Sequence, residues 1–314
     1  MSLAGLMAAP QAWAQQAKLP GPVKILVGFA AGGQSDLLAR FVADKMKDTL
    51  GTPVVVENKT GAGGRIAVAA AKTAPADGTT LVLANISHMS VAPSIYKDLP
   101  YDPVKDFTPI GRVADFQIAL TTGKQTGAKD FKALLAWLKA NPDKASSGNP
   151  GSGSLPHLYG FELGTAAGIK LTAVPYRGGS PIVAALNQGE LAMGWASITD
   201  FIEQHRAGKM HIVAVTGSKR SAQLPETPTF AELGYPSVSS NGWIGLFGPA
   251  AMKPDVVATL HKALTAALAD ASVAGKMAKL GMIVAPSSGA ELAAQAATDR
   301  KKWQPVIDKA GIKQ

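Results

Sequence analysis

Strand-like and helix-like segments alternate along this chain, and this alternation restricts the fold more than any other feature. Residues 23–29, VKILVGF, form a β-branched and apolar run that predicts a buried parallel strand. In the following SDLLARFVADKMKDTLG, apolar residues recur on one helical stripe that ends at a glycine. PVVVENK and TTLVLAN predict two further strands, with a glycine-rich turn and a helix between them. This order is typical of a right-handed parallel α/β sheet.

The alternation restarts between residues 130 and 217, which predicts a second α/β unit. DFKALLAWLKANP, LPHLYGFELGTAAG and PIVAALNQG read as helices, and KASSGN, KLTAVPY, ELAMGWA and MHIVAVTG as strands. We expect one domain of residues 21–122 plus 242–314 and a second of residues 123–241. The chain would then cross between them near Leu120–Gly123 and Ser239–Trp243, which are the hinge candidates.

Composition narrows the class of protein. No segment of the 314 residues approaches the roughly 18 consecutive apolar residues of a membrane span, so we expect a soluble mature protein. Cysteine is absent, which excludes disulfides, thiolate catalysis and cysteine-ligated zinc. The net charge is +9, but Lys and Arg are scattered singly, and residues 300–302 are the densest cluster. We therefore expect no nucleic-acid partner, because such binding needs a focused basic stripe, while the positive field would attract small anions.

The first residues, MSLAGLMAAPQAWAQQAKLP, indicate export. An apolar stretch precedes Ala12-Trp13-Ala14, the small-x-small pattern of a signal-peptidase site, and a polar segment follows. Residues 1–20 are therefore interpreted as the remnant of an export signal and left out of the fold. The alternative is a disordered alanine-rich terminus.

GFAAGGQSD, residues 28–36, resembles a phosphate-binding loop with one residue changed. Gly28, Gly33 and Ser35 fit that pattern, but Gln34 stands where the lysine should be. Nucleotide hydrolysis is therefore not supported, because the lysine that supplies positive charge to the phosphates is absent. A glycine-rich turn with inward amides and a helix N-terminus remains, which suits a singly charged carboxylate. The alternative is a plain tight turn in which Ser35 or Asp36 caps the helix.

SSGNPGSGSLPHL, from residue 146, forms a second Gly/Ser loop between a strand and a helix. Ser152 and Ser154, with free amides at Gly151 and Gly153, could hold a carboxylate from the other side. The alternative is a flexible surface loop. The loop has no G-x-S-x-G elbow, and His157 has no obvious acidic partner, so a serine hydrolase is unsupported.

The remaining polar residues at strand ends form no catalytic set. Asn85, Ser87 and His88 end one predicted strand, and Arg177 follows another. The five histidines lack a compact metal-binding spacing, so we expect neither a metal nor a cofactor. Polar loops at strand C-termini without acid/base pairs are more typical of a binding protein than of an enzyme.

Nearly the whole mature chain resembles the Bug-type solute-binding proteins, the extracytoplasmic receptors of tripartite tricarboxylate transporters. The resemblance rests on segments in a specific order: AAGGQSDLLAR, VENKTGAGGRIA, PADGTTLVLA, YDPVKDFTPIGRV, GSGSLPHL, VPYRGGSP, ALNQGELAMGW, RAGKMHIVAVTGSKRSAQLPETPTFAELGYP and GWIGLFGPAAMKPDVV. It implies a two-domain, type II-like periplasmic binding protein fold, with a doubly wound, mostly parallel sheet in each domain and a ligand cleft between them.

The resemblance also implies which residues bind the ligand. In the family, two loops hold the carboxylate across the cleft, and further segments shape the pocket. Carried over to this chain, the binding residues are Phe29, Ala31, Gly32, Gly33, Ser35, Asn85, Ser87, His88, Gly151, Ser152, Gly153, Ser154, Tyr176, Gly178, Trp195 and Ser197. One departure is Ala192, where the family usually has an aspartate, and Trp195 beside it is unusual for a pocket edge.

The function implied is that of a periplasmic receptor. It would close on a small carboxylate and deliver it to two membrane subunits of a transporter. Two alternatives stay open: a ligand-dependent sensory adaptor for a kinase, and an enzyme acting on a small acid, which would depend on His88, His157 or Arg177.

Overall fold

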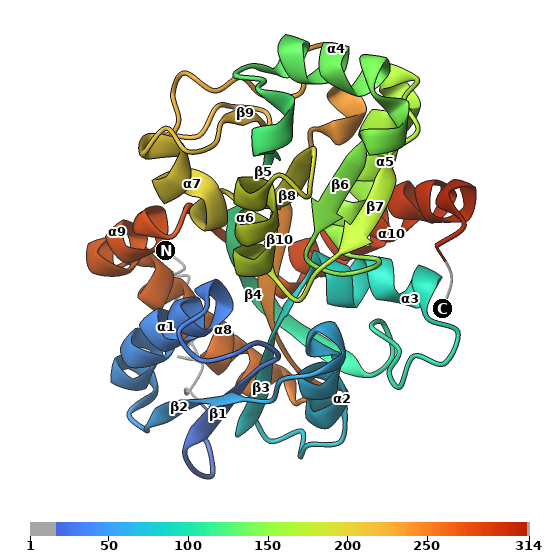
Figure 1. The fold of residues 1–314 in the computed structure, drawn as a ribbon. Helices are drawn as coiled ribbons and strands as arrows, with labels where there is room; N and C mark the ends of the chain where they lie inside the picture. The colour runs from blue at the N-terminus through green and yellow to red at the C-terminus, as the bar shows by residue number, and fades with distance from the viewer. Residues whose placement is uncertain (1–16, 313–314) are drawn as a thin grey trace, which may run out of the picture.

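In the computed structural model, which describes residues 17–312, the strands form a six-stranded sheet and a five-stranded sheet. Most of the predicted export-signal remnant, residues 1–16, lies outside the described residues. Figure 1 shows the second sheet above the first. The strands are β1 (Val23–Val27), β2 (Val54–Asn58), β3 (Thr80–Asn85), β4 (Phe107–Phe116), β5 (Ile118–Thr122), β6 (Ser146–Asn149), β7 (Thr172–Pro175), β8 (Met193–Ser197), β9 (Ile212–Val215), β10 (Gly242–Pro249) and β11 (Met282–Ser288).

Helices flank both sheets, as the alternating pattern predicts (Figure 1). They are α1 (Gln34–Leu50), α2 (Arg65–Lys72), α3 (Ala92–Ile95), α4 (Phe131–Ala140), α5 (Leu155–Ala167), α6 (Gly179–Gln188), α7 (Ile198–Arg206), α8 (Pro254–Ala269), α9 (Ala271–Lys279) and α10 (Gly289–Ala310). Within residues 17–312, no single helix is long and apolar enough to cross a membrane, and α8 with α9 reaches that length only across a bend of 71°.

The two sheets follow one plan. The first has the order β11-β4-β10-β3-β1-β2 and the second β7-β6-β8-β5-β9. In each, three strands pair in parallel, β2-β1-β3 and β7-β6-β8. An antiparallel strand then enters beside the third, β10 in the first sheet and β5 in the second. The predicted two-unit α/β fold is confirmed, but each sheet is mixed rather than mostly parallel, because the strands that follow a crossing run against their neighbours.

The first crossing lies earlier in the chain than predicted. β4 belongs to the first sheet and β5 already pairs with β8 and β9 of the second, so the chain crosses at Gln117 and not at Leu120–Gly123. Residues 118–122 therefore belong with the second sheet. The buried Gln117 side chain donates hydrogen bonds to the carbonyls of Thr216 (2.6 Å) and Lys219 (2.8 Å), which follow β9. The first crossing is thus bound to the segment after β9, and the Gly217 amide of that segment donates to the carbonyl of Ser239 (2.7 Å) in the second crossing.

Apolar packing continues from one unit to the other. Trp303 of α10 and Tyr159 of α5 are both fully buried, and their rings meet edge to face with centroids 5.3 Å apart. The Tyr159 hydroxyl donates to the carbonyl of Ser240, in the segment that leads into β10. Helix α10 therefore connects the first sheet, which it packs on through β4, to the second unit.

Candidate functional site

The loops that hold most of the predicted binding residues follow the C-terminal ends of β1, β3, β6 and β8, where the two sheets adjoin. Ligands of open α/β sheets bind at such strand ends. Contacts link the loops of the two sheets directly: a Cβ added to Gly153 would lie 2.5 Å from Cδ1 of Ile95, and the Tyr96 hydroxyl lies 3.5 Å from the carbonyl oxygen of Ser152. We call this region the interlobe boundary.

Helix α1 begins at the interlobe boundary with open amides. Its N-cap is Gly33, whose backbone is extended (φ −74°, ψ 167°) and which has no side chain to cap the helix. Leu37 is the first residue to donate to this turn, 3.0 Å from the Gly33 carbonyl. Among the described residues, the amides of Gln34, Ser35 and Asp36 find no acceptor. Three free N–H groups at the positive end of a helix form a suitable environment for an anion.

Asp36 lies beside these amides, but its negative charge is offset by its partners. Its buried carboxylate accepts two hydrogen bonds of 2.9 Å from Arg40 and one each, also 2.9 Å, from the Gly32 amide and from Asn58. Burial alone would raise the pKa, but these donors outweigh it and lower the pKa of Asp36 to about 2. The ion pair with Arg40 neutralises the charge locally, and the bond to Gly32 fixes the loop rather than capping α1.

His88 joins two loops of the first sheet. Its Nδ1 accepts from the Asn85 amide (3.2 Å), so Nε2 carries the proton and donates to the Gly63 carbonyl (2.9 Å). Burial is the main cause that lowers the pKa of His88 to about 4, so the ring is neutral at pH 7. The Phe29 ring lies over it, with centroids 5.8 Å apart, and remains 37% exposed. His88 therefore shapes the site but has no free nitrogen for acid/base work.

The Gly/Ser loop after β6 uses its amides differently from the prediction. The expectation of free amides at Gly151 and Gly153 is wrong, because Gly151 donates to Oδ1 of Asn149 (3.2 Å) and Gly153 to Nδ1 of His157 (3.0 Å). Short polar side chains that bond nearby backbone commonly fix such turns. The Ser154 hydroxyl caps α5 by accepting from the His157 amide. Within the described residues, the amide and hydroxyl of Ser152 remain without partners, so this serine is the open donor of the loop.

Gln34, which occupies the lysine position of a phosphate loop, spans the interlobe boundary. Its Oε1 accepts from the Ser197 hydroxyl (3.3 Å) at the end of β8. Its Nε2 donates to the carbonyl of Leu280 (2.9 Å) and lies 3.5 Å from the Thr199 hydroxyl. The sequence revealed only that Gln34 is not a lysine. Its bridging role depends on two segments more than 160 residues further along the chain, which no local pattern could indicate.

The other predicted residues divide into boundary and core positions. Tyr176 and Gly178 lie between β7 and α6, where Gly178 (φ 113°) is the helix N-cap. Trp195 is fully buried and stacks on Phe230 with centroids 5.3 Å apart, so its side chain is part of the core. Ala192 is buried before β8, at the opposite end of that strand from Ser197. The missing aspartate therefore does not alter the interlobe boundary.

No group of three or more His, Cys, Asp or Glu side chains within residues 17–312 is placed to hold a metal ion. Arg177 is exposed on the loop after β7. The boundary thus combines backbone donors, hydroxyls and one exposed aromatic ring, which can bind a small anion.

Comparison with known proteins identifies the family of this chain. The chain matches the tripartite tricarboxylate transporter family receptor over residues 38–312. It is 32% identical to BugT of Bordetella pertussis over 93% of this chain and 90% of that protein. The periplasmic binding protein BugD is 35% identical, with a TM-score of 0.83 over 94% of this chain and 99% of the other. MatC from Rhodopseudomonas palustris, solved with bound malate, is 29% identical, with a TM-score of 0.81 over 92% and 99%.

The matches cover nearly the full length of the relatives as well as of this chain, and they confirm the resemblance seen in the sequence. The chain belongs to the tripartite tricarboxylate transporter receptor family, whose members are solute-binding proteins.

Proposed function

We propose that this protein is a periplasmic receptor that binds a small carboxylate at the interlobe boundary and delivers it to a tripartite transporter with two membrane subunits. The observation that carries the proposal is the uncapped N-terminus of α1, whose three open amides adjoin the loops of the second sheet. The family match and the malate bound to MatC support a carboxylate as the ligand.

One carboxylate would lie between the α1 terminus and Ser152. The amides of Gln34 and Ser35 and the hydroxyls of Ser35 and Ser152 would donate to its oxygens, and the exposed ring of Phe29 would cover the hydrocarbon part. Tyr176, Gly178 and Ser197 line the same boundary and complete the proposed site. Such charge-assisted hydrogen bonds to backbone N–H groups are about twice as strong as neutral ones.

Binding would couple to movement of the two units, residues 17–116 with 242–312 against residues 118–241. The crossings at Gln117 and Ser239–Asn241 are the proposed hinge. Gln34 already joins the units on one side of the boundary. A ligand held by both loops would stabilise the closed form through its greater affinity for that form. The transporter subunits would recognise this closed form.

An enzyme on this scaffold has less support, because both ring nitrogens of His88 are engaged and Nδ1 of His157 holds the Gly153 amide. A sensory adaptor uses the same ligand-dependent closure, so a kinase partner is compatible with the site. A ligand-dependent pull-down of a sensor domain would distinguish that role from uptake.

The proposal is tested by removing one backbone donor at the α1 terminus. Gln34→Pro deletes the amide at the first helical position, where proline fits. The extended backbone of Gly33 is also the conformation that a following proline requires. Gln34→Ala is the matched control, because it removes the same side-chain contacts and keeps the amide.

Malate binding is measured by titration calorimetry, with dimethyl malate as the uncharged control ligand. We expect Gln34→Pro to bind malate about 10- to 100-fold more weakly than Gln34→Ala, as for the loss of one hydrogen bond to a charged group. Equal affinities for the two variants, or equal binding of malate and its diester by the wild type, would refute the proposed site. If malate does not bind, succinate, adipate and aspartate are tested in the same way.

A further inference from the structure

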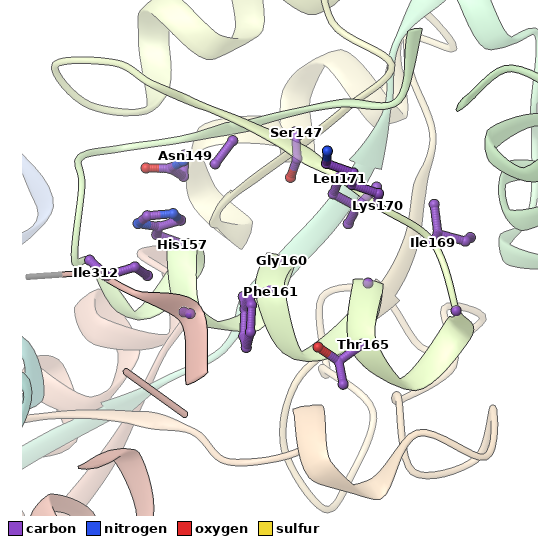
Figure 2. Close-up of a pocket in the computed structure, with 14 residues that line it drawn as sticks. Ser147, Asn149, His157, Gly160, Phe161, Thr165, Ile169, Lys170, Leu171 and Ile312 are labelled. Carbon is purple, nitrogen blue, oxygen red and sulfur yellow. The ribbon is translucent and has the colours of Figure 1, made fainter. Parts of the chain in front are cut away.

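A cavity of about 510 Å³ lies on the second unit, away from the amides of α1. It is bounded by α5, by β6 and β7, and by the end of α10 (Figure 2). Figure 2 shows Asn149, His157 and Ile312 at one end and Ile169 with Thr165 at the other. A cavity of this size accommodates a small organic molecule.

The polar groups of this cavity are donors. His157 keeps its proton on Nε2, since Nδ1 accepts from the Gly153 amide, and burial lowers the pKa of His157, which keeps the ring neutral. Oδ1 of Asn149 accepts from the Gly151 amide, which leaves its NH₂ group as the free end. Lys170 is exposed at the rim and forms no ion pair with any carboxylate of the described residues. None of the side chains that line the cavity is acidic.

An unpaired donor lies directly beneath the cavity floor. Nε1 of Trp195 is buried and has no hydrogen-bond partner among the described residues. It would be 3.4 Å from a Cβ on Gly160, and the Ser147 hydroxyl would be 3.2 Å from the same point. Gly160 and Ser147 both line the cavity. Because Trp195 can only donate, the floor adds positive potential and no competing acceptor.

The rest of the wall is apolar. Phe161, Leu171, Ala173 and Ile312 supply hydrocarbon surface between the polar end and the rim. A ligand that matches both parts has an acceptor-rich, negatively charged group and a hydrocarbon body.

We propose that this cavity is a second binding site, separate from the interlobe boundary, for a small amphipathic monocarboxylic acid. The carboxylate contacts the donors of Asn149 and His157 at the polar end, the hydrocarbon body lies against Phe161 and Leu171, and Lys170 at the rim adds a positive charge.

The site also connects to the loop at the interlobe boundary. Asn149 and His157 line the cavity and hold the amides of Gly151 and Gly153. An acid bound there touches the two side chains that shape the loop around Ser152. The affinity of the boundary ligand therefore changes when the cavity is occupied, and the reverse effect has the same magnitude.

The test uses 3-phenylpropanoate as the probe and titration calorimetry on the full chain. Its matched controls are 3-phenylpropan-1-ol, which lacks the charge, and propanoate, which lacks the ring. We expect the wild type to bind the probe at least about tenfold more tightly than either control. Lys170→Glu should weaken probe binding by about tenfold or more, and Ala173→Phe, which fills the cavity from an exposed strand position, should abolish it.

Two further variants identify the site that the probe occupies. Lys139→Glu, the same charge change on the last turn of α4, should leave probe affinity unchanged. Gln34→Pro should weaken malate but not 3-phenylpropanoate. Absence of probe binding to the wild type, or binding that withstands both Lys170→Glu and Ala173→Phe, would overturn the second site. Probe binding lost in Gln34→Pro would place the probe at the interlobe boundary and would also overturn it.

Discussion

His88 connects the loop at Gly63 to the end of β3, and its replacement gives the sharpest stability test of the site's architecture. In the folded protein the pKa of His88 is about 4, against an ordinary value of 6.5, and the ring is only 3% exposed. When folding lowers the pKa of a histidine, its neutral ring stabilises the folded state at any pH above the pKa of the unfolded chain. This stability is lost as the pH falls toward the pKa of the folded protein, because only the unfolded chain then gains the proton. The contribution of His88 to the free energy of unfolding should therefore fall as the pH decreases from 6.5 to 4.

The magnitude follows from this shift. Between pH 7.5 and 4.5 the unfolded chain gains a proton that buried His88 does not accept, which lowers the free energy of unfolding by about 2.5 kcal/mol. Glu162, whose pKa burial raises to about 7, changes stability in the opposite direction over part of this range. For this reason the comparison must be between the wild type and His88→Gln at each pH, so that Glu162 and all other groups cancel.

The assay is urea unfolding followed by circular dichroism at pH 7.5 and pH 4.5. We expect the stability lost through His88→Gln to be about 2.5 kcal/mol larger at pH 7.5 than at pH 4.5. The same loss for His88→Gln at both pH values would refute the assignment of His88 as a buried, neutral bridge.

Three further changes test other parts of the structure. Ser154→Ala removes the N-cap of α5 and should cost about 1 kcal/mol in urea unfolding, whereas Ser152→Ala should not change stability; equal effects would contradict the assignment of the two hydroxyls. Glu162→Gln should stabilise the protein by about 1–3 kcal/mol at pH 8 and little at pH 4.5, because a raised carboxyl pKa costs stability as the pH rises through 7, and a gain at both pH values would argue against a buried Glu162. Gln117→Ala should cost about 1–3 kcal/mol by leaving the carbonyls of Thr216 and Lys219 without this donor, and a neutral result in thermal unfolding would show that the first crossing is not held by these bonds.

The order of strands and helices could be predicted from the sequence because each element has its own period and its own glycine or proline boundary. The first crossing could not, since a single residue, Gln117, separates the end of β4 from the start of β5, and no glycine or proline marks the change of sheet. The family resemblance implies that Trp195 lies at the pocket edge. The local pattern could not correct this, because β8 is buried on both faces and a strand without alternation does not reveal which side a residue faces.

Loop chemistry was predictable only where partners are close in sequence. Arg40 lies four residues after Asp36, a helical spacing at which an ion pair can be expected. The partners of Gly151 and Gly153 are also close in sequence, at Asn149 and His157, but a turn of this kind allows several side-chain orientations, so the number of open amides could not be read from the spacing. By contrast, the contact of Gln34 with Ser197 depends on the packing of the two units, which a single-sequence pattern does not contain.

The central claim is that the altered phosphate loop and the facing Gly/Ser loop hold a carboxylate. The most direct test is to denature the purified protein and to identify the released small molecules by mass spectrometry, together with a thermal-shift screen of carboxylic acids. The account predicts a released or stabilising carboxylic acid, whose effect weakens in Ser35→Ala and Ser152→Ala. A nucleotide or phosphate ester that binds where no acid does would contradict it.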